Sequence, residues 1–296
     1  MKQASKQLAA LAVAFLALTL AAPASAVDLD AGDYTALPGG TNALVIYGQH
    51  ATRDALYSKG NQVPINPRLD SDIGILRGVH FMDVGGHIID PQFLLPFGRL
   101  SAKDDISALG SKSGVGDLIL ASAIWFTRPG DKTHFAITPY LWLPTGTYGR
   151  NQPLSLGEHR YKFALQAGYS TELAPGVNWD LAGDVTLFGK NTDANDGQGG
   201  ATTLKQKALY EFQTHLRYQL TPVLDLRVGL FHTFGGETEL GGVNQGDRQV
   251  TTKFNVGTAW FVAPTVQLLA TYGRDIKVRN GFKINNQINL RLLTLF

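Results

Sequence analysis

Ten charged side chains at alternating positions are the residues of this chain best placed to do chemistry. In segment 204–220, Lys207, Glu211 and Arg217 share one face, while Tyr210 and Phe212 share the other. Alternate residues of a β-strand point to opposite faces, so these charges line one face of a sheet. The full set is Arg160, Lys162, Lys205, Lys207, Glu211, Arg217, Arg227, Lys253, Lys277 and Arg291. It would act either as a basic ladder that attracts anions or as one side of interstrand salt bridges.

Catalytic and metal-binding patterns have little support in the sequence. None of the seven histidines stands in a His-x-Ser-Asn arrangement, and His232 shares its face with apolar residues. Asp193 and Asp196 lie in a loop rich in Gly and Asn, which lacks the ligand spacing of a calcium loop. The absence of cysteine excludes disulfides and thiolate metal sites. We therefore expect no enzyme, no metal and no cofactor, and keep a barrel hydrolase as the least favoured alternative.

The N-terminus predicts a secretory signal peptide over residues 1–26. Lys2 and Lys6 precede the apolar run "LAALAVAFLALTLAA", and "PASA" follows with a cleavage site after Ala26. The run is shorter than the roughly 20 residues that a transmembrane helix needs. The rest of the chain has no second long apolar stretch, so we expect an exported protein without a transmembrane helix.

From residue 43 onwards the chain repeats strand-like runs separated by two kinds of break. Short breaks such as "RPGDK" alternate with longer polar ones such as "NTDANDGQGGATT". Tight turns alternating with long loops indicate an up-and-down meander. Twelve runs occur, at 43–58, 69–82, 88–99, 115–127, 133–144, 158–173, 177–190, 204–220, 224–235, 248–262, 266–279 and 284–296. An even strand number returns both ends to the tight-turn side, which faces the periplasm in bacterial outer-membrane barrels.

The length of the runs indicates which face meets lipid. They exceed the roughly 9–11 residues that a tilted strand needs to cross a bilayer. Aromatic residues near strand ends fit interfacial girdles, namely Tyr57, Trp125, Phe126, Tyr140, Trp142, Tyr161, Tyr218 and Trp260. The pattern therefore predicts an all-β, 12-stranded antiparallel transmembrane β-barrel over residues 43–296. The apolar face of the barrel would meet lipid, and its charged face would line a water-filled lumen. The net charge of the chain is only +2, which gives no reason to expect a nucleic-acid partner.

Residues 27–42 precede the first strand and have two interpretations. They could form a periplasmic segment, or they could fold into the lumen as a plug. Their acidic residues Asp28, Asp30 and Asp33 would suit a basic lumen. A 12-stranded barrel lies between small filled barrels and wide porins, so the sequence favours a narrow or partly occluded passage.

Three motifs carry a family resemblance that spans nearly the whole mature chain. "GVGDLIL" (114–120), "PYLWLPTGTYG" (139–149) and "VRNGFKINNQINLRLLTLF" (278–296) resemble the proteobacterial outer-membrane family called phenol meta-degradation pathway MetA-like. The resemblance implies a monomeric outer-membrane barrel, often encoded beside catabolic genes for aromatic or other hydrophobic compounds. We expect a porin-like channel for passive uptake of small organic molecules. The alternative is a structural or adhesive barrel acting through its extracellular loops.

The C-terminal strand ends on an aromatic residue, Phe296. With the alternating Leu292, Leu290 and Ile288 before it, Phe296 resembles the signal that the barrel-assembly machinery reads. We therefore expect that machinery, outer-membrane lipid and small organic solutes as the partners of the chain.

Overall fold

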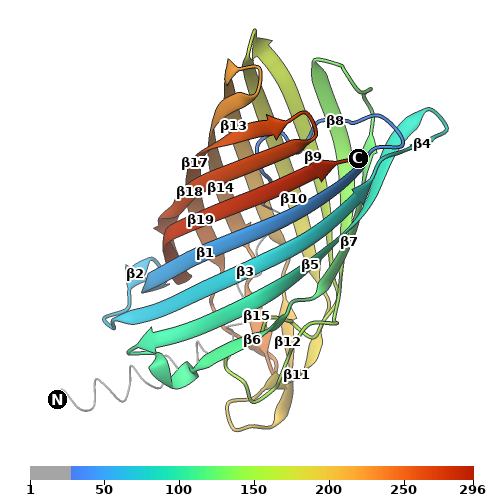
Figure 1. Ribbon diagram of the computed structural model, residues 1–296. Coiled ribbons are helices and arrows are strands. Elements are labelled where there is room, and N and C mark those ends of the chain that lie inside the picture. The colour runs from blue at the N-terminus through green and yellow to red at the C-terminus, as the bar shows by residue number, and fades with distance from the viewer. Residues whose placement is uncertain (1–27) are drawn as a thin grey trace.

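Residues 28–296, which the computed structural model describes, form a closed antiparallel β-barrel (Figure 1). Each long strand pairs with the next one along the chain, and β19 returns to pair with β1. Within this range the twelve long strands are β1 (Asn42–Ser58), β3 (Pro67–His80), β5 (His87–Asp104), β7 (Leu118–Trp125), β8 (Thr133–Leu143), β9 (Lys162–Ala174), β10 (Val177–Phe188), β13 (Leu209–Thr221), β14 (Leu224–Gly235), β17 (Gln249–Ala263), β18 (Val266–Val278) and β19 (Gly281–Leu295). The predicted 12-stranded barrel is confirmed.

The predicted signal peptide lies outside the described residues. Among residues 28–296, no helix is long and apolar enough to cross a membrane.

Shorter elements extend the barrel at its two ends. The strands β2 (Asn61–Gln62) and β6 (Ser111–Val115) and the 3₁₀ turn η1 (Ser107–Leu109) lie among the long connections, and β4 (Met82–Val84) forms a tight hairpin with β5. A separate four-stranded sheet contains β11 (Asn191–Asn195), β12 (Ala201–Gln206), β15 (Thr238–Leu240) and β16 (Val243–Asn244). In Figure 1 this second sheet projects from the end opposite β4 and the C-terminus.

Pairing between the first and last strands closes the barrel. The register runs from Ala43 opposite Leu295 to Tyr57 opposite Gly281, with a bulge near Arg53. Beyond the last strand residue, the backbone N–H of Phe296 donates to the Asn42 carbonyl (3.0 Å), and the N–H of Asn42 donates back (2.8 Å). A closed ladder leaves no strand edge unpaired in lipid.

The two faces of the barrel differ in the way that the alternation predicts. The outward face carries exposed large apolar side chains on all the long strands except β3, whereas charged and amide side chains are buried on the inward face. One part of the aromatic-girdle prediction is wrong. Trp125, Tyr140 and Trp142 are buried because they occupy inward positions, where Trp125 packs edge-on against Tyr34 with ring centroids 5.9 Å apart. Phe126, Tyr161, Tyr218 and Trp260 do lie exposed on the outside.

The "GVGD" and "PTG" motifs hold together an irregular part of the wall. Gly116 and Asp117 interrupt the strand between β6 and β7, opposite Pro96 of β5. A proline has no N–H to donate, so the break costs no ladder bond at that position. The Asp117 carboxylate accepts the backbone N–H groups of Gly146 and Glu158, both at 2.9 Å. These bonds tie the 144–161 connection to the wall.

Candidate functional site

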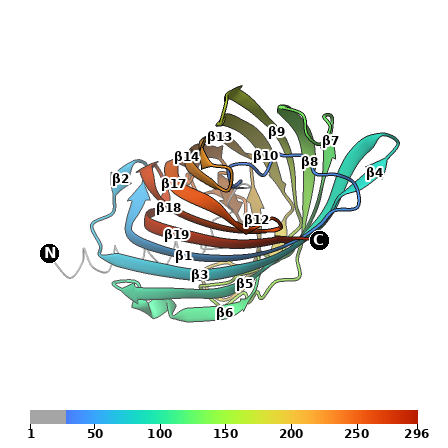
Figure 2. The same cartoon turned by 45° about the horizontal axis from the view of Figure 1, so that its top comes forward.

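Residues 28–37 lie inside the barrel rather than beside it. Figure 2 shows the blue trace that precedes β1 crossing the mouth and turning into the interior. The backbone N–H of Leu29 donates to Gln213 (2.9 Å) and that of Gly32 to Asp180 (2.9 Å). Tyr34 and Ala36 belong to the buried apolar cluster of the lumen. The segment therefore contacts the inner wall along its length.

The acidic residues of this segment pair with bases on opposite walls. Arg291 of β19 donates to Asp30 (2.9 Å) and to Asp33 (2.8 Å), and Arg77 of β3 lies 3.5 Å from Asp33. Burial alone raises the pKa of Asp33, but Arg291 and Arg77 outweigh it and leave this pKa below the ordinary value. Asp28 accepts from Lys253 of β17 at 2.6 Å. Ion pairs therefore hold the segment, and those of Arg291 and Arg77 are largely buried while that of Lys253 is partly exposed.

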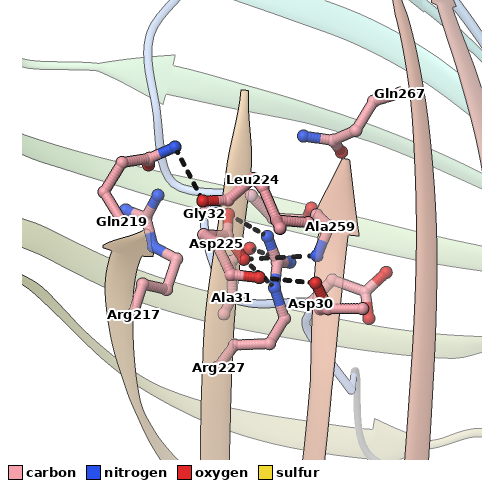
Figure 3. A network of polar contacts seen from close by, with 12 residues as sticks. Asp30, Ala31, Gly32, Arg217, Gln219, Leu224, Asp225, Arg227, Ala259 and Gln267 are labelled. Carbon is pink, nitrogen blue, oxygen red and sulfur yellow. Dashed lines mark hydrogen bonds and ion pairs between the residues drawn. The ribbon is translucent and has the colours of Figure 1, made fainter. Parts of the chain in front are cut away.

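A second set of arginines holds the segment from β13 and β14. The Arg227 guanidinium forms a two-pronged pair with Asp225 and donates through Nη1 to the Ala31 carbonyl (2.8 Å), as Figure 3 shows. Arg217 pairs with Asp180 at 2.9 Å. Both arginines are thus neutralised by carboxylates of the wall. Arg227 holds the segment directly through the Ala31 carbonyl, and Arg217 does so indirectly, through the Asp180 carboxylate that also accepts from Gly32.

Arg160 and Lys162 form a separate cluster at the long-loop end. Both donate to the buried carboxylate of Glu158 at 2.5 Å. Burial raises the pKa of Glu158, but the two bases outweigh this effect and lower it to about 2. Arg160 also lies over the Phe188 ring, and Lys162 over the Trp142 ring. Buried and paired, this cluster fixes the wall where β9 begins.

Three predicted lumen residues lie elsewhere. Lys205 belongs to β12 of the second sheet and pairs with Glu239, and Lys207 lies between β12 and β13 and pairs with Glu237. The predicted strand 204–220 is divided at this point, so the two lysines are exposed outside the barrel. Lys277 is exposed because a bulge in β18 moves the inward position to Val278. The other seven predicted residues are on the inner wall, including Glu211, which accepts from Thr233 at 2.6 Å.

Arg77 is a lumen residue in contact with the internal segment that the sequence did not single out. It donates to Tyr47 (3.0 Å) and Gln92 (2.7 Å) in addition to its contact with Asp33. The segment around it, "GILRGVH", is apolar on both faces, and Arg77 shares its face with Ile75 and Val79, so the pattern gave no sign of a charged lumen position.

A cavity of about 140 Å³ remains between the internal segment and the wall. Aromatic and aliphatic side chains line it together with paired charges, among them Tyr47, Tyr140, Phe231, Ile75 and Leu94. An apolar cavity of roughly 150 Å³ accommodates benzene in a well-studied protein, so this space is on the scale of one aromatic ring. The cavity is small and its lining is mixed in polarity.

The comparisons with known proteins agree with this architecture. The family model described as "Putative MetA-pathway of phenol degradation" matches residues 52–292. The chain belongs to this family. A solved outer-membrane channel from Pseudomonas putida F1 is 40% identical to it, with a TM-score of 0.87 over 91% of this chain and 100% of that one. No curated protein matches the chain.

A more distant structure shares the fold alone. The β-domain of the Bordetella autotransporter BrkA is 11% identical, with a TM-score of 0.55 over 87% of this chain and 99% of that one. Family membership and the closed barrel place this chain in the bacterial outer membrane, among channel proteins and not enzymes.

Proposed function

We propose that the protein is a passive outer-membrane channel for small organic molecules, aromatic compounds among them. The observation that carries this function is the narrow lumen of a closed barrel that is 40% identical to an outer-membrane channel. The family description and a cavity on the scale of one aromatic ring support the aromatic substrate class. Transport of this kind is diffusion down a concentration gradient.

In this proposal residues 28–37 act as an internal plug. Asp28, Asp30 and Asp33 neutralise lumen bases that would otherwise attract anions, which favours uncharged or weakly charged solutes. While the segment stays in place, it prevents the lumen from forming a wide, water-filled pore. A solute would pass beside the segment or after it shifts.

Liposome swelling tests the proposed function. Purified protein is reconstituted in vesicles, and swelling is followed in isotonic phenylalanine, a small aromatic solute that has no net charge and crosses lipid slowly, and in a disaccharide. We expect faster swelling in phenylalanine than in the disaccharide. Rates for phenylalanine are compared with those of protein-free vesicles. Rates no higher than those of protein-free vesicles in both solutes would contradict a channel, and equal rates for both would contradict a narrow one.

A further inference from the structure

Leu154, in the long connection between β8 and β9, is buried in an apolar cluster at the long-loop end of the barrel. Only 2% of its surface is exposed, although residues 151–153 just before it are exposed. The buried side chains that pack with it, which we call the seat, are Leu69, Leu100, Ala102 and Ile106. The first three occupy inward positions of β3 and β5, where Leu69 and Ala102 are register partners. Leu154 therefore inserts among residues of the inner wall that are distant from it in the sequence.

The connection that carries Leu154 is fixed on both sides of this residue. The backbone N–H of Thr147 donates to the Val115 carbonyl (2.8 Å), and that of Gly157 donates to the Thr147 carbonyl (3.0 Å). The Tyr148 hydroxyl donates to the Asp193 carbonyl of the second sheet at 2.7 Å. These anchors are directional hydrogen bonds, whereas Leu154 is held in the seat by apolar burial, which has no directional requirement. Another apolar group can therefore replace Leu154 in the seat while the anchors stay in place.

The inner wall leads from the seat to the cavity beside the internal segment. Inward positions of β3 run from Leu69 through Ser71 and Ile73 to Ile75, which lines the cavity. Ile73 packs against the seat, and Ser71 is the polar position of this path, where its hydroxyl accepts from Arg53 at 3.0 Å. The path from Leu69 to Ile75 is about 20 Å long at the rise of an extended strand. A solute that leaves the seat thus meets a mostly apolar wall on its way to the cavity.

We propose that the seat is the entry site of the channel, and that it binds the uncharged ring of an aromatic solute in competition with Leu154. The ring gains apolar burial in the seat, which offsets the exposure of Leu154. A sugar or an ion that entered the seat would lose hydration without gaining hydrogen bonds from these side chains. Leu154 therefore determines specificity at the end of the barrel that faces outside. This assignment rests on the proposed channel function and names its entry step.

Uptake of radiolabelled phenylalanine by vesicles that contain the protein tests this competition. We expect the initial rate to saturate with concentration, because binding in the seat precedes passage. In Leu154→Ala the competing side chain is removed, so the half-saturating concentration should fall at least about threefold. Leu165→Ala, which shortens an exposed leucine on the outward face of β9, is the matched control and should leave that concentration unchanged. Gel migration of unheated samples first verifies that each variant is a folded barrel.

Hydrogen–deuterium exchange of the natural protein tests the seat without requiring transport. Benzyl alcohol should speed exchange in residues 150–157, because its ring displaces Leu154, whereas glycerol at the same concentration should not. Exchange that benzyl alcohol leaves unchanged overturns the entry site. So does a half-saturating concentration that is the same in Leu154→Ala, or disaccharide uptake that rises in this variant as much as phenylalanine uptake. Faster exchange without phenylalanine uptake above that of protein-free vesicles would support ring binding in the seat and contradict the channel function.

Discussion

Arg291 of the last strand lies 2.8 Å from Asp33 of the segment that precedes the first strand, 258 residues away in the sequence. The same guanidinium nitrogen also contacts Asp30 at 2.9 Å. The strand that closes the barrel therefore also fixes the segment inside it. One buried side chain of the closing strand is thus among the groups that hold the segment in the lumen.

Replacing Arg291 should loosen the internal segment. In Arg291→Gln, Asp30 and Asp33 lose their principal cation while still buried, and breaking a buried pair in this way costs roughly 3–5 kcal/mol. We expect faster hydrogen–deuterium exchange in residues 28–37 than in the natural protein. Arg274→Gln, which removes an exposed arginine from β18, is the control and should leave that exchange unchanged. Equal protection in both variants would show that the ion pairs do not hold the segment.

Filling the space beside Tyr34 should displace the segment without changing any charge. A Cβ added at Gly168 of β9 would overlap the Tyr34 ring, which is buried against Trp125. Gly168→Ala should therefore cost about 1–3 kcal/mol of stability by overpacking and speed solute entry in the liposome assay. Gly48→Ala, where an added Cβ meets no atom within 4 Å, should change neither quantity. Slower entry in Gly168→Ala would contradict the plug.

The Glu158 cluster predicts sensitivity to acid. The pKa of Glu158 is about 2 in the folded protein against an ordinary 4.5, so its stabilising effect is fully present above pH 4.5. It should be lost as the pH falls toward 2, because the unfolded chain takes up the proton first. Glu158→Gln should unfold at a lower temperature at pH 7 and show a flatter pH profile. Glu239→Gln removes an exposed pair with Lys205 and serves as the control, since such pairs contribute little.

Removing Phe296 should impair assembly more than conduction. Its side chain is 72% exposed at the end of the closing strand, so it contributes little to packing, while its backbone extends the pairing with Asn42. We expect lower outer-membrane levels of the variant that lacks Phe296, measured by quantitative immunoblot of membrane fractions. Phe296→Tyr keeps an aromatic terminus and should restore them. Unchanged levels without Phe296 would remove its role as an assembly signal.

Alternation and turn chemistry were enough to predict the barrel and most of its inward charges. They succeeded for Arg217, Arg227 and Arg291 because period-two spacing fixes the face of a regular strand. They failed where the strand is not regular. The division before β13 took Lys205 and Lys207 out of the barrel, and the bulge in β18 exposed Lys277.

Partners far apart in the sequence were also beyond sequence reasoning. The spacing of charges in 27–42 suited a basic lumen, but the specific contacts of Asp33 with Arg77 and Arg291 depend on the closed geometry. Arg77 was missed because both faces of the segment around it are apolar in sequence. Arg77 becomes part of the site because the internal segment lies opposite its face of β3, which brings Asp33 to 3.5 Å from the guanidinium.

Single-channel conductance of the natural protein and of Asp30→Asn/Asp33→Asn tests the central claim most directly. These substitutions remove the carboxylates that Arg291 holds while leaving the side-chain volumes nearly unchanged. A narrow channel with an internal plug predicts small, resolved current steps for the natural protein and larger or more frequent openings for the variant. Flat traces from both, with protein shown to be inserted in the bilayer, would contradict a channel. Identical currents from both would contradict the plug.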